Sequence, residues 1–324
     1  MRLIHISDYD YDSMQLAKPI FDSKKRVLLA SGRHVHPKYI ERLKLMNITH
    51  MFVEDNISRG INLDEMIDMP TWMDAIDLVQ DTFEKVEKNE KIDVIAIQQL
   101  AGKLIVEVQK RPLLVLVPVS TIPRNLYPYA HAVNVALLSV QVGKRLFLNQ
   151  LQLRDLVIGC LLHDIGKIKA DEDEGHPKEG FEIIRKIREF NIVSAHVAYQ
   201  HHESLNGTGY PRKLTGQDFH KFAQICGIAN QYENMVTKKQ IPPHEAMERL
   251  MTMSDTNYET SIVHAFVQGI PSYPPGTKIE LNTNERGIVI RLESQLQRPI
   301  VRTLPDEKII NLEDHPTIII NGLA

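Results

Sequence analysis

The sequence predicts a mainly α-helical protein, in which a long helical region lies between a small α+β module and a small β domain. Apolar residues recur at helical spacing from about residue 64 to residue 268, and shorter strand-like runs precede and follow that region. We therefore expect an N-terminal module over 1–62, a helical connector over 63–110, a helical domain over 111–269 and a β domain over 270–324.

The N-terminal module combines short strands with one helix. The sequence predicts strands over 27–30 and 50–53, a turn at Ser31-Gly32 and a short helix over 37–46. This mixture is typical of a small α+β fold.

The connector contains two amphipathic helices, separated near Asn89. Their apolar faces can pair between two copies of the chain, so a homodimer is expected. Trp72, near the start of the first helix, is expected to pack in an interface rather than bind a base. The apolar positions are Ile76, Val79, Phe83, Val86, Ile95, Ile97, Leu100, Leu104 and Val108.

The character of the chain changes after residue 268. The stretch 270–276 contains three prolines and cannot continue a helix. Strand-like segments follow at 278–281, 287–292 and 299–303. A small β domain is the fold that these segments predict.

Composition excludes several classes of function. A formal net charge of −3 and a pI near 6.5 give no global positive field, so neither a nucleic acid polymer nor an acidic membrane surface is an expected partner. No apolar run approaches the roughly 20 residues that span a bilayer, and no apolar signal region follows Met1. Cys160 and Cys226 lie in apolar helical stretches, as reduced core thiols do. A cytoplasmic protein without membrane insertion is expected.

Histidines and one aspartate recur in the helical region in an ordered set. Imidazole and carboxylate groups together suit iron, manganese or zinc, and a carboxylate can bridge two ions. Separate helices could bring these side chains together. The set is His131, the pair His163-Asp164, His176 and the pair His201-His202.

Two of these pieces carry a family resemblance, which extends from about residue 127 to residue 248. The first resembles the signature of HD-domain phosphohydrolases and reads Leu161-Leu162-His163-Asp164-Ile165-Gly166-Lys167-Ile168. The second resembles the signature of the HD-GYP subgroup and reads His201-His202-Glu203, followed by Gly207-Thr208-Gly209-Tyr210-Pro211.

The resemblance implies a helical domain of the HD type that hydrolyses a cyclic dinucleotide, usually cyclic di-GMP, with two metal ions. Iron and manganese are the expected metals, ahead of zinc. One ion would be held by His131, His163, Asp164 and the residue at position 230, which is Asn230. The other would be held by Asp164, His176, His201 and His202, so that Asp164 bridges the two ions.

Other residues of the motifs imply contacts with substrate or partner. Lys167 is expected to meet a phosphate oxygen, although a solvated lysine is the plain alternative. Gly207 and Gly209 permit positive φ and close backbone approach, Pro211 stiffens the exit of the loop, and Tyr210 is thereby held in place. The resemblance makes this loop a site for a signalling protein; guanine or protein contacts of Tyr210 both stay open.

The chain departs from the family pattern at several positions. Asn206 and Asn230 stand where aspartate is usual, and the neutral amide at 230 predicts a weakly held first ion. Glu233 replaces another usual aspartate and could supply a compensating carboxylate. Lys238 and Lys239 stand where an arginine often binds the dinucleotide phosphate, and Lys239 is a predicted substrate contact.

Two functions from different classes therefore stay open, besides an HD hydrolase that acts on a different phosphorylated substrate. The first is a metal-dependent phosphodiesterase that opens cyclic di-GMP to the linear dinucleotide or to GMP, with activity reduced by Asn230. The second is a catalytically degenerate domain that binds a cyclic dinucleotide or a partner protein in signalling. Some members of the family bind a third ion through a glutamate where this chain has Tyr127, so at most two ions are expected.

Overall fold

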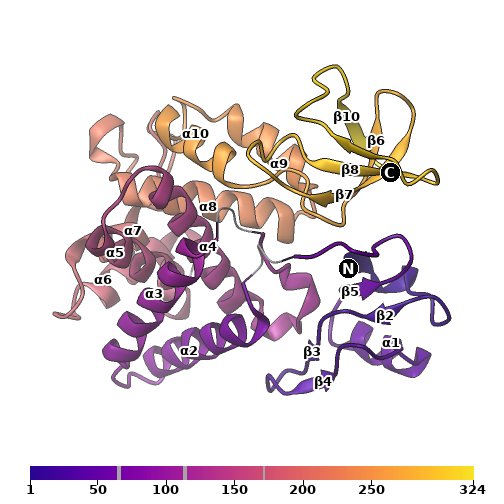
Figure 1. The fold of residues 1–324 in the computed structure, drawn as a ribbon. Coiled ribbons are helices and arrows are strands. Elements are labelled where there is room, and N and C mark those ends of the chain that lie inside the picture. The colour runs from indigo at the N-terminus through magenta and orange to yellow at the C-terminus, as the bar shows by residue number, and fades with distance from the viewer. Residues whose placement is uncertain (64–66, 112–114, 171) are drawn as a thin grey trace. The chain divides into compact units, whose positions relative to one another are not determined.

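The chain folds into two compact units in a computed structural model that describes residues 1–63, 67–111, 115–170 and 172–324 (Figure 1). The first unit comprises Met1–Met66, Val117–Tyr127 and Pro271–Ala324, and the second comprises Ile67–Leu116 and Pro128–Ile270. The two ends of the chain thus belong to one unit. The domain boundaries expected at residues 62, 110 and 269 stay a prediction.

The first unit contains the β-structure of the chain, and every strand pair in it is antiparallel. Three sheets are present in the described residues, with strand orders β1-β5-β2, β3-β4 and β10-β6-β7-β8-β9. The strands are β1 (Arg2–His5), β2 (Gln15–Leu16), β3 (Ile20–Phe21), β4 (Val27–Leu29), β5 (His50–Glu54), β6 (Lys278–Leu281), β7 (Arg286–Arg291), β8 (Ile300–Leu304), β9 (Ile309–Asn311) and β10 (Ile320–Leu323). One helix, α1 (Pro37–Leu45), packs its buried Leu43 into the core of the N-terminal part.

Backbone carbonyls join the N-terminal and C-terminal parts of this unit. The guanidinium of Arg302 on β8 donates to the carbonyl oxygens of Ile57, at 2.5 Å, and Arg59, at 3.1 Å. Nearby, the α-amino group of Met1 donates to the carbonyl of Ile61 at 2.7 Å. Residues near both ends of the sequence, Met1 and Arg302, therefore donate hydrogen bonds to the segment that follows β5.

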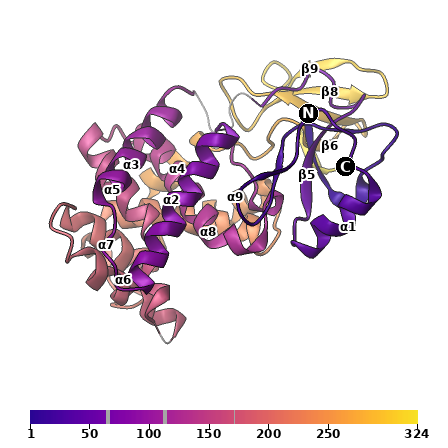
Figure 2. The same ribbon diagram turned by 90° about the horizontal axis from the view of Figure 1, so that it is seen from below.

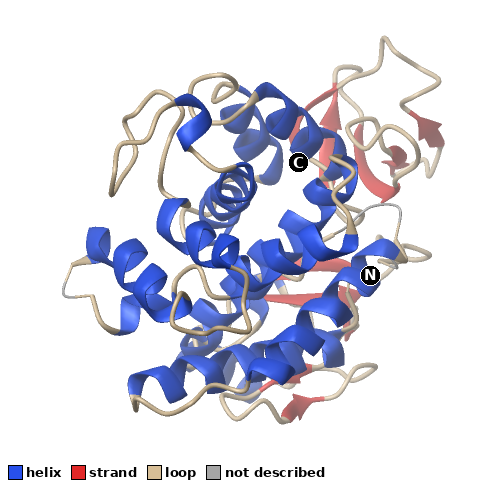
Figure 3. Cartoon of the chain, turned by 90° about the vertical axis from the view of Figure 1, so that its left-hand side faces the viewer, coloured by secondary structure: helices blue, strands red, loops and turns tan. Residues whose placement is uncertain are grey.

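The second unit is helical, as the blue elements of Figure 3 show. Helix α7 packs against α5, α6 and α8, while α3 packs against α5. Figure 2 shows the same helices from another side. The helices are α2 (Met69–Glu87), α3 (Val94–Gln109), α4 (Tyr127–Arg145), α5 (Gln150–Leu161), α6 (His176–Ile184), α7 (Ile192–Gln200), α8 (Lys221–Thr237), α9 (Pro243–Met251) and α10 (Thr260–Gly269).

The break between the two connector helices has a local cause. Helix α2 ends at Glu87, and Asn89 adopts the left-handed conformation, with φ 56°, that commonly terminates a helix. Asp93 then caps α3 by accepting a hydrogen bond from the amide of Ala96. The apolar faces of both helices are mostly buried within the chain, and Ile95 and Val106 of α3 stay exposed.

The predicted fold class is confirmed: a helical region is flanked by small antiparallel sheets near both ends. Cys160 and Cys226 are free and buried, as expected. Among the described residues, no helix combines the length and the apolar character needed to cross a bilayer.

Candidate metal centre

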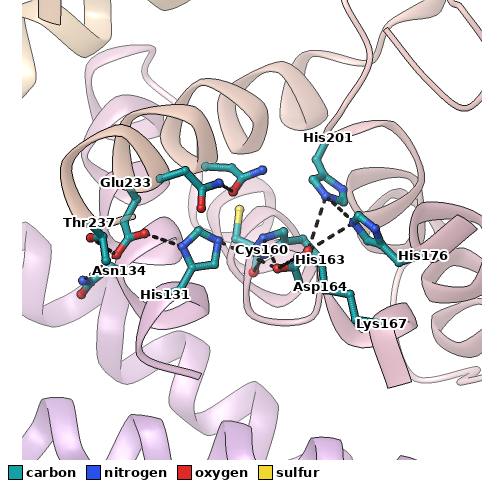
Figure 4. A network of polar contacts seen from close by, with 12 residues as sticks. His131, Asn134, Cys160, His163, Asp164, Lys167, His176, His201, Glu233 and Thr237 are labelled. Carbon is teal, nitrogen blue, oxygen red and sulfur yellow. Dashed lines mark hydrogen bonds and ion pairs between the residues drawn. The ribbon is translucent and has the colours of Figure 1, made fainter. Parts of the chain in front are cut away.

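Four segments of the helical unit supply six of the predicted ligands. His131 lies in the first half of α4, and His176 is the first residue of α6. His163 and Asp164 lie in the turn between α5 and the 3-10 helix η4 (Ile165–Ile168). His201 and His202 follow directly on α7. Residues far apart in the sequence therefore converge (Figure 4).

The ligand atoms form two overlapping groups that share Asp164. The first, here called the α4 side, consists of His131, His163 and Asp164, and the second, the α7 side, consists of Asp164, His176, His201 and His202; the atoms of each group lie within 4.8 Å of one another. Asp164 lies between the two sides, as a bridging ligand would. The structure thus brings together six of the seven predicted ligands.

Distances to the two carboxylate oxygens of Asp164 separate the sides. Oδ2 faces the α4 side, 3.5 Å from Nε2 of His163 and 4.0 Å from Nε2 of His131. Oδ1 faces the α7 side, 3.3 Å from Nε2 of His176 and 3.7 Å from Nε2 of His201. Figure 4 shows these imidazoles directed at the carboxylate from opposite directions.

The donor set fits a transition metal. Among the described residues, Nε2 of His131 and Nε2 of His163 are buried and have no hydrogen-bond partner. Buried polar atoms in native proteins are nearly always paired, so two such nitrogens facing one carboxylate call for an ion between them. Imidazole nitrogens with a carboxylate suit iron, manganese or zinc.

The second nitrogen of three histidines is fixed by the chain itself. Nδ1 of His163 donates to the carbonyl of Cys160 at 2.7 Å, and Nδ1 of His201 donates to the carbonyl of Ala198 at 2.8 Å. Nδ1 of His131 instead lies 2.5 Å from the carboxylate of Glu233 on α8. Each contact leaves Nε2 as the lone-pair nitrogen that a metal needs.

Burial sets the charge of the site. Burial lowers the pKa of His163 to about 4 and that of His202 to about 3. Burial would raise the pKa of Asp164, but the charge of His163 and a hydrogen bond from His176 hold it well below its ordinary value. At neutral pH the imidazoles of His163 and His202 are thus neutral and the carboxylate of Asp164 is ionised, which is the form that binds metal.

Glu233 has a different position from the one expected of a compensating ligand. It is buried and accepts hydrogen bonds from Thr237, at 2.9 Å, and from Asn134, at 3.5 Å, besides that of His131. Burial would raise its pKa, but the charge and the hydrogen bond of His131 hold it below its ordinary value. The Glu233 carboxylate therefore orients the predicted ligand His131 through the Nδ1 atom of its ring.

Asn230 lies one turn before Glu233 on α8 and is also buried. Its Oδ1 accepts a 2.7 Å hydrogen bond from Nδ2 of Asn234. A carbonyl oxygen has a second lone pair, so this contact leaves room for an ion. The role of Asn230 as a ligand stays a prediction.

A glycine lets the first turn of α6 approach Asp164. A Cβ atom on Gly166 would lie 2.0 Å from the carbonyl oxygen of His176, so no other residue fits without moving the backbone. This close packing of η4 on α6 places the imidazole of His176 beside the carboxylate.

The loop that follows His202 is fastened by the buried carboxylate of Glu203, a motif residue to which the sequence assigned no role. Glu203 accepts hydrogen bonds from the amides of Arg212, at 2.7 Å, and Leu214, at 3.0 Å. Gly207 has φ 76°, and a Cβ on Gly209 would lie 2.4 Å from Cα of Glu203. Both glycines therefore meet the requirements expected of them.

Tyr210 is held against the candidate site. Its amide donates to the carbonyl of His202 at 3.1 Å, and its ring stacks on that of His202, with centroids 4.5 Å apart and planes 13° apart. One face of the phenol ring is thus covered by a predicted ligand. Pro211 follows and is exposed.

The predicted phosphate contacts differ in their placement. Nζ of Lys167 lies 2.7 Å from Oδ2 of Asp164, and its side chain is 39% exposed, so this ammonium borders the site. Lys239 is exposed beyond the end of α8, and within the described chain its side chain makes no hydrogen bond or ion pair.

Two positions that depart from the family pattern make local contacts. Asn206 accepts hydrogen bonds from Thr208 and shapes the loop. Tyr127 donates to the carbonyl of Asn47 at 2.9 Å.

Comparison with known proteins places this centre within a family. The model of the HD domain family matches residues 129–235. The cyclic di-GMP phosphodiesterase PA4108 of Pseudomonas aeruginosa is 24% identical over 227 residues, which cover 64% of this chain and 55% of that protein. The cyclic di-GMP phosphodiesterase PdeB of Borreliella burgdorferi is 26% identical over 217 residues, which cover 59% and 56%. The chain spans about half the length of these relatives.

A solved structure shares the fold. Bd1817, an HDG"Y"P protein from Bdellovibrio bacteriovorus, matches with a TM-score of 0.51 and 18% identity, and the match covers 82% of this chain and 97% of Bd1817. The family match contains His131, His163, Asp164, His176, His201 and His202. The two motifs meet at one centre within this fold, and residues 129–235 match the HD domain; together these findings support an HD-GYP domain protein.

Proposed function

We propose that this chain is a metal-dependent phosphodiesterase that hydrolyses cyclic di-GMP to the linear dinucleotide or to GMP. The single observation that carries the proposal is the pair of histidine groups that share Asp164. Bound metal ions would lower the pKa of a water molecule and neutralise charge on the phosphate. Iron or manganese is proposed because the donors are imidazoles and a carboxylate.

The side chains have separable tasks in this proposal. Asp164 is ionised and faces both sides, so it would bridge two ions. Lys167, whose ammonium already meets Oδ2 of Asp164, would turn to a phosphate oxygen of the substrate. Tyr210 forms a wall of the α7 side through its stack on His202.

The relatives named as cyclic di-GMP phosphodiesterases support the class of substrate. Lys167 is the cation that borders the site, and the exposed Lys239 is a second candidate phosphate contact. We propose the cytoplasm as the location, supported by two buried free thiols. We also propose that the chain forms a homodimer through the exposed Ile95 and Val106. A signalling protein would bind at the Gly207–Pro211 loop.

One observation favours the second candidate function, a binding domain without turnover. Oδ1 of Asn230 is engaged by Asn234, and a neutral amide holds a cation less strongly than a carboxylate does. The α4 side would then bind its ion weakly, and the protein would turn over slowly or only bind the dinucleotide. We propose slow turnover, because the remaining donors of both sides are in place.

Purified protein with iron or manganese and cyclic di-GMP tests the proposal, with products separated by chromatography. The expected result is metal-dependent formation of the linear dinucleotide or GMP. A cyclic dinucleotide with one guanine and one adenine, tested in parallel, gives the base preference. Tight binding of cyclic di-GMP without product supports the binding domain, and neither binding nor product overturns both functions.

A further inference from the structure

A buried polar chain leads from helix α2 to the metal centre. Nε1 of Trp72 donates to Oδ1 of Asn134 at 3.0 Å, across 62 residues of sequence. Nδ2 of Asn134 faces Oε1 of Glu233 at 3.5 Å, and Oε2 of Glu233 meets Nδ1 of His131 at 2.5 Å. All four residues are buried. Figure 4 shows the inner three of them in sequence toward Asp164.

The direction of each contact is set by chemistry. An indole N–H can only donate, so the oxygen of the Asn134 amide must face Trp72 and its NH₂ group must face Glu233. Oε2 of Glu233 lies 2.5 Å from Nδ1 of His131 and accepts a hydrogen bond there, so in the neutral imidazole Nδ1 carries the proton. The free lone pair of His131 is then on Nε2, which faces Asp164.

We propose that Trp72 and Asn134 are positioning residues of the metal centre, and that the Trp72 indole on α2 sets the affinity of the α4 side for its ion. This inference rests on the proposed function, because it assumes that His131 is a ligand. Among the described residues, the indole N–H of Trp72 donates to Asn134 and not to a ligand. It acts by holding the oxygen of the Asn134 amide, so that the NH₂ group of that amide faces the Glu233 carboxylate.

Among the described residues, no such chain of hydrogen bonds joins α2 to His201 or His202. Nδ1 of His201 donates to the carbonyl of Ala198, in the adjacent turn of the backbone. A change in the position of α2 should therefore act on the α4 side and leave the α7 side unchanged. A shift of α2, the first helix of the helical unit, can therefore change the affinity of the site for one of the two ions.

Four variants of the full chain test the inference with Mn²⁺ as the probe, by equilibrium dialysis and elemental analysis after chelator treatment. Trp72→Phe keeps an aromatic ring and removes the donor; Asn134→Ala removes the middle contact. The third variant combines both changes. Thr82→Val is the matched control, because Thr82 lies buried on the same helix and donates only to the carbonyl of Leu78.

Trp72→Phe should weaken one Mn²⁺ site by about 3–10-fold, less than the 10–100-fold typical of a direct partner of a ligand. The second site should be unchanged, and Thr82→Val should stay within about twofold of the unmodified chain at both sites, since its contact lies outside the chain of four. The double variant should lose no more affinity than Asn134→Ala, because the two residues act in series.

The outcomes separate the inference from the proposed function. An unmodified chain that binds no Mn²⁺ overturns the metal centre and the inference together. An unmodified chain that binds Mn²⁺ while Trp72→Phe matches Thr82→Val, or losses that add in the double variant, overturns the inference alone.

Intrinsic fluorescence gives an independent readout, since Trp72 is the single tryptophan of the chain. The emission of the unmodified protein should change on titration with Zn²⁺ and saturate with the same affinity as the α4 site. This measurement decides the question if Trp72→Phe fails to fold. Emission that is unaffected while the α4 site fills would then overturn the inference.

Discussion

The two sides of the metal centre differ in what holds their histidines. On the α7 side, His201 is fixed by a backbone carbonyl of the preceding turn, and His202 is covered by the ring of Tyr210 from the following loop. On the α4 side, His131 is fixed by the side chain of Glu233, which lies 102 residues further along the chain. His201 and His202 therefore depend on local sequence, whereas the α4 side combines a local contact of His163 with the tertiary contact of His131.

The difference implies that the two ions should respond to different changes. A backbone contact persists in almost any variant that folds, whereas a side-chain contact can be removed or altered without unfolding. The amide of Asn230 adds to this contrast, because it gives the α4 side a neutral oxygen. The α4 side is thus the adjustable half of the centre.

Asp164→Ala should have the largest effect, because it removes the one residue that both sides share. Metal content should fall to near zero at both sites, and hydrolysis should fall by more than about 100-fold, the upper range for loss of an outer-shell contact. Elemental analysis and the chromatographic assay measure the two losses. Asp155→Asn, at another buried aspartate, is the control for folding; full activity of Asp164→Ala would exclude the proposed centre.

Asn230→Asp should strengthen the α4 side alone. The change adds a charged oxygen at nearly constant volume, and Asn234 can still donate to it. Metal affinity at one site should rise by about 10-fold or more, and turnover should rise with occupancy. Metal content and hydrolysis would be followed at limiting metal. If both are unchanged, Asn230 does not face the ion, and its neutral amide does not contribute to the difference between the two sides.

Acid should destabilise the metal-free protein through both sides. The pKa of His163 is about 4 and that of His202 about 3, so in the folded state both stay neutral at pH values where the unfolded chain is protonated. The unfolded state then binds more protons, and the free energy of unfolding decreases as pH falls below about 6.5. The expected slope is about 1.4 kcal/mol per pH unit for each histidine.

Denaturant unfolding of chelated protein between pH 7.5 and 5 measures this slope. His163→Asn should flatten it by about 1 kcal/mol per pH unit, because one such group is lost. The same substitution at the exposed His264 is the control. An unchanged slope in His163→Asn would show that its burial does not oppose protonation.

Tyr210→Ala should have the smallest effect, confined to the α7 side. The stack on His202 is worth about 0.5–1.5 kcal/mol, which corresponds to roughly a 2–10-fold loss of metal affinity. Tyr210→Phe keeps the stack and should bind metal normally. Equal losses in both variants would assign the effect to the phenol hydroxyl instead, and a loss at the α4 site would contradict the separation of the sides.

The sequence predicted the helices and the convergence of the histidines well, because both depend on local signals. Helical periodicity located α2 and α3, and Asn89 marked the break between them. The two motifs identified His163, His201 and His202, and the wider family resemblance added His131 and His176. Short strands were missed where the signal is weak: β1 has four residues, and β10 contains a glycine.

Contacts across long stretches of sequence could not be predicted. Glu233 was considered as a metal ligand, and only the packing of α8 against α4 places its carboxylate on Nδ1 of His131. Trp72 was expected in an interface, but its acceptor, Asn134, has no sequence signal. The two ends of the chain lie in one unit, in which Arg302 donates to the carbonyl of Ile57. This arrangement also depends on tertiary contacts.

The division of the first unit between the two ends of the sequence has a consequence for biosynthesis. A ribosome adds about 5–20 residues per second, so the roughly 200 residues from Ile67 to Ile270 take about 10–40 s to emerge. During this time the carbonyls of Ile57 and Arg59 have no Arg302 to meet and are hydrated. All the candidate ligands leave the ribosome before β8, so the nascent chain can bind metal before Arg302 reaches the N-terminal segment.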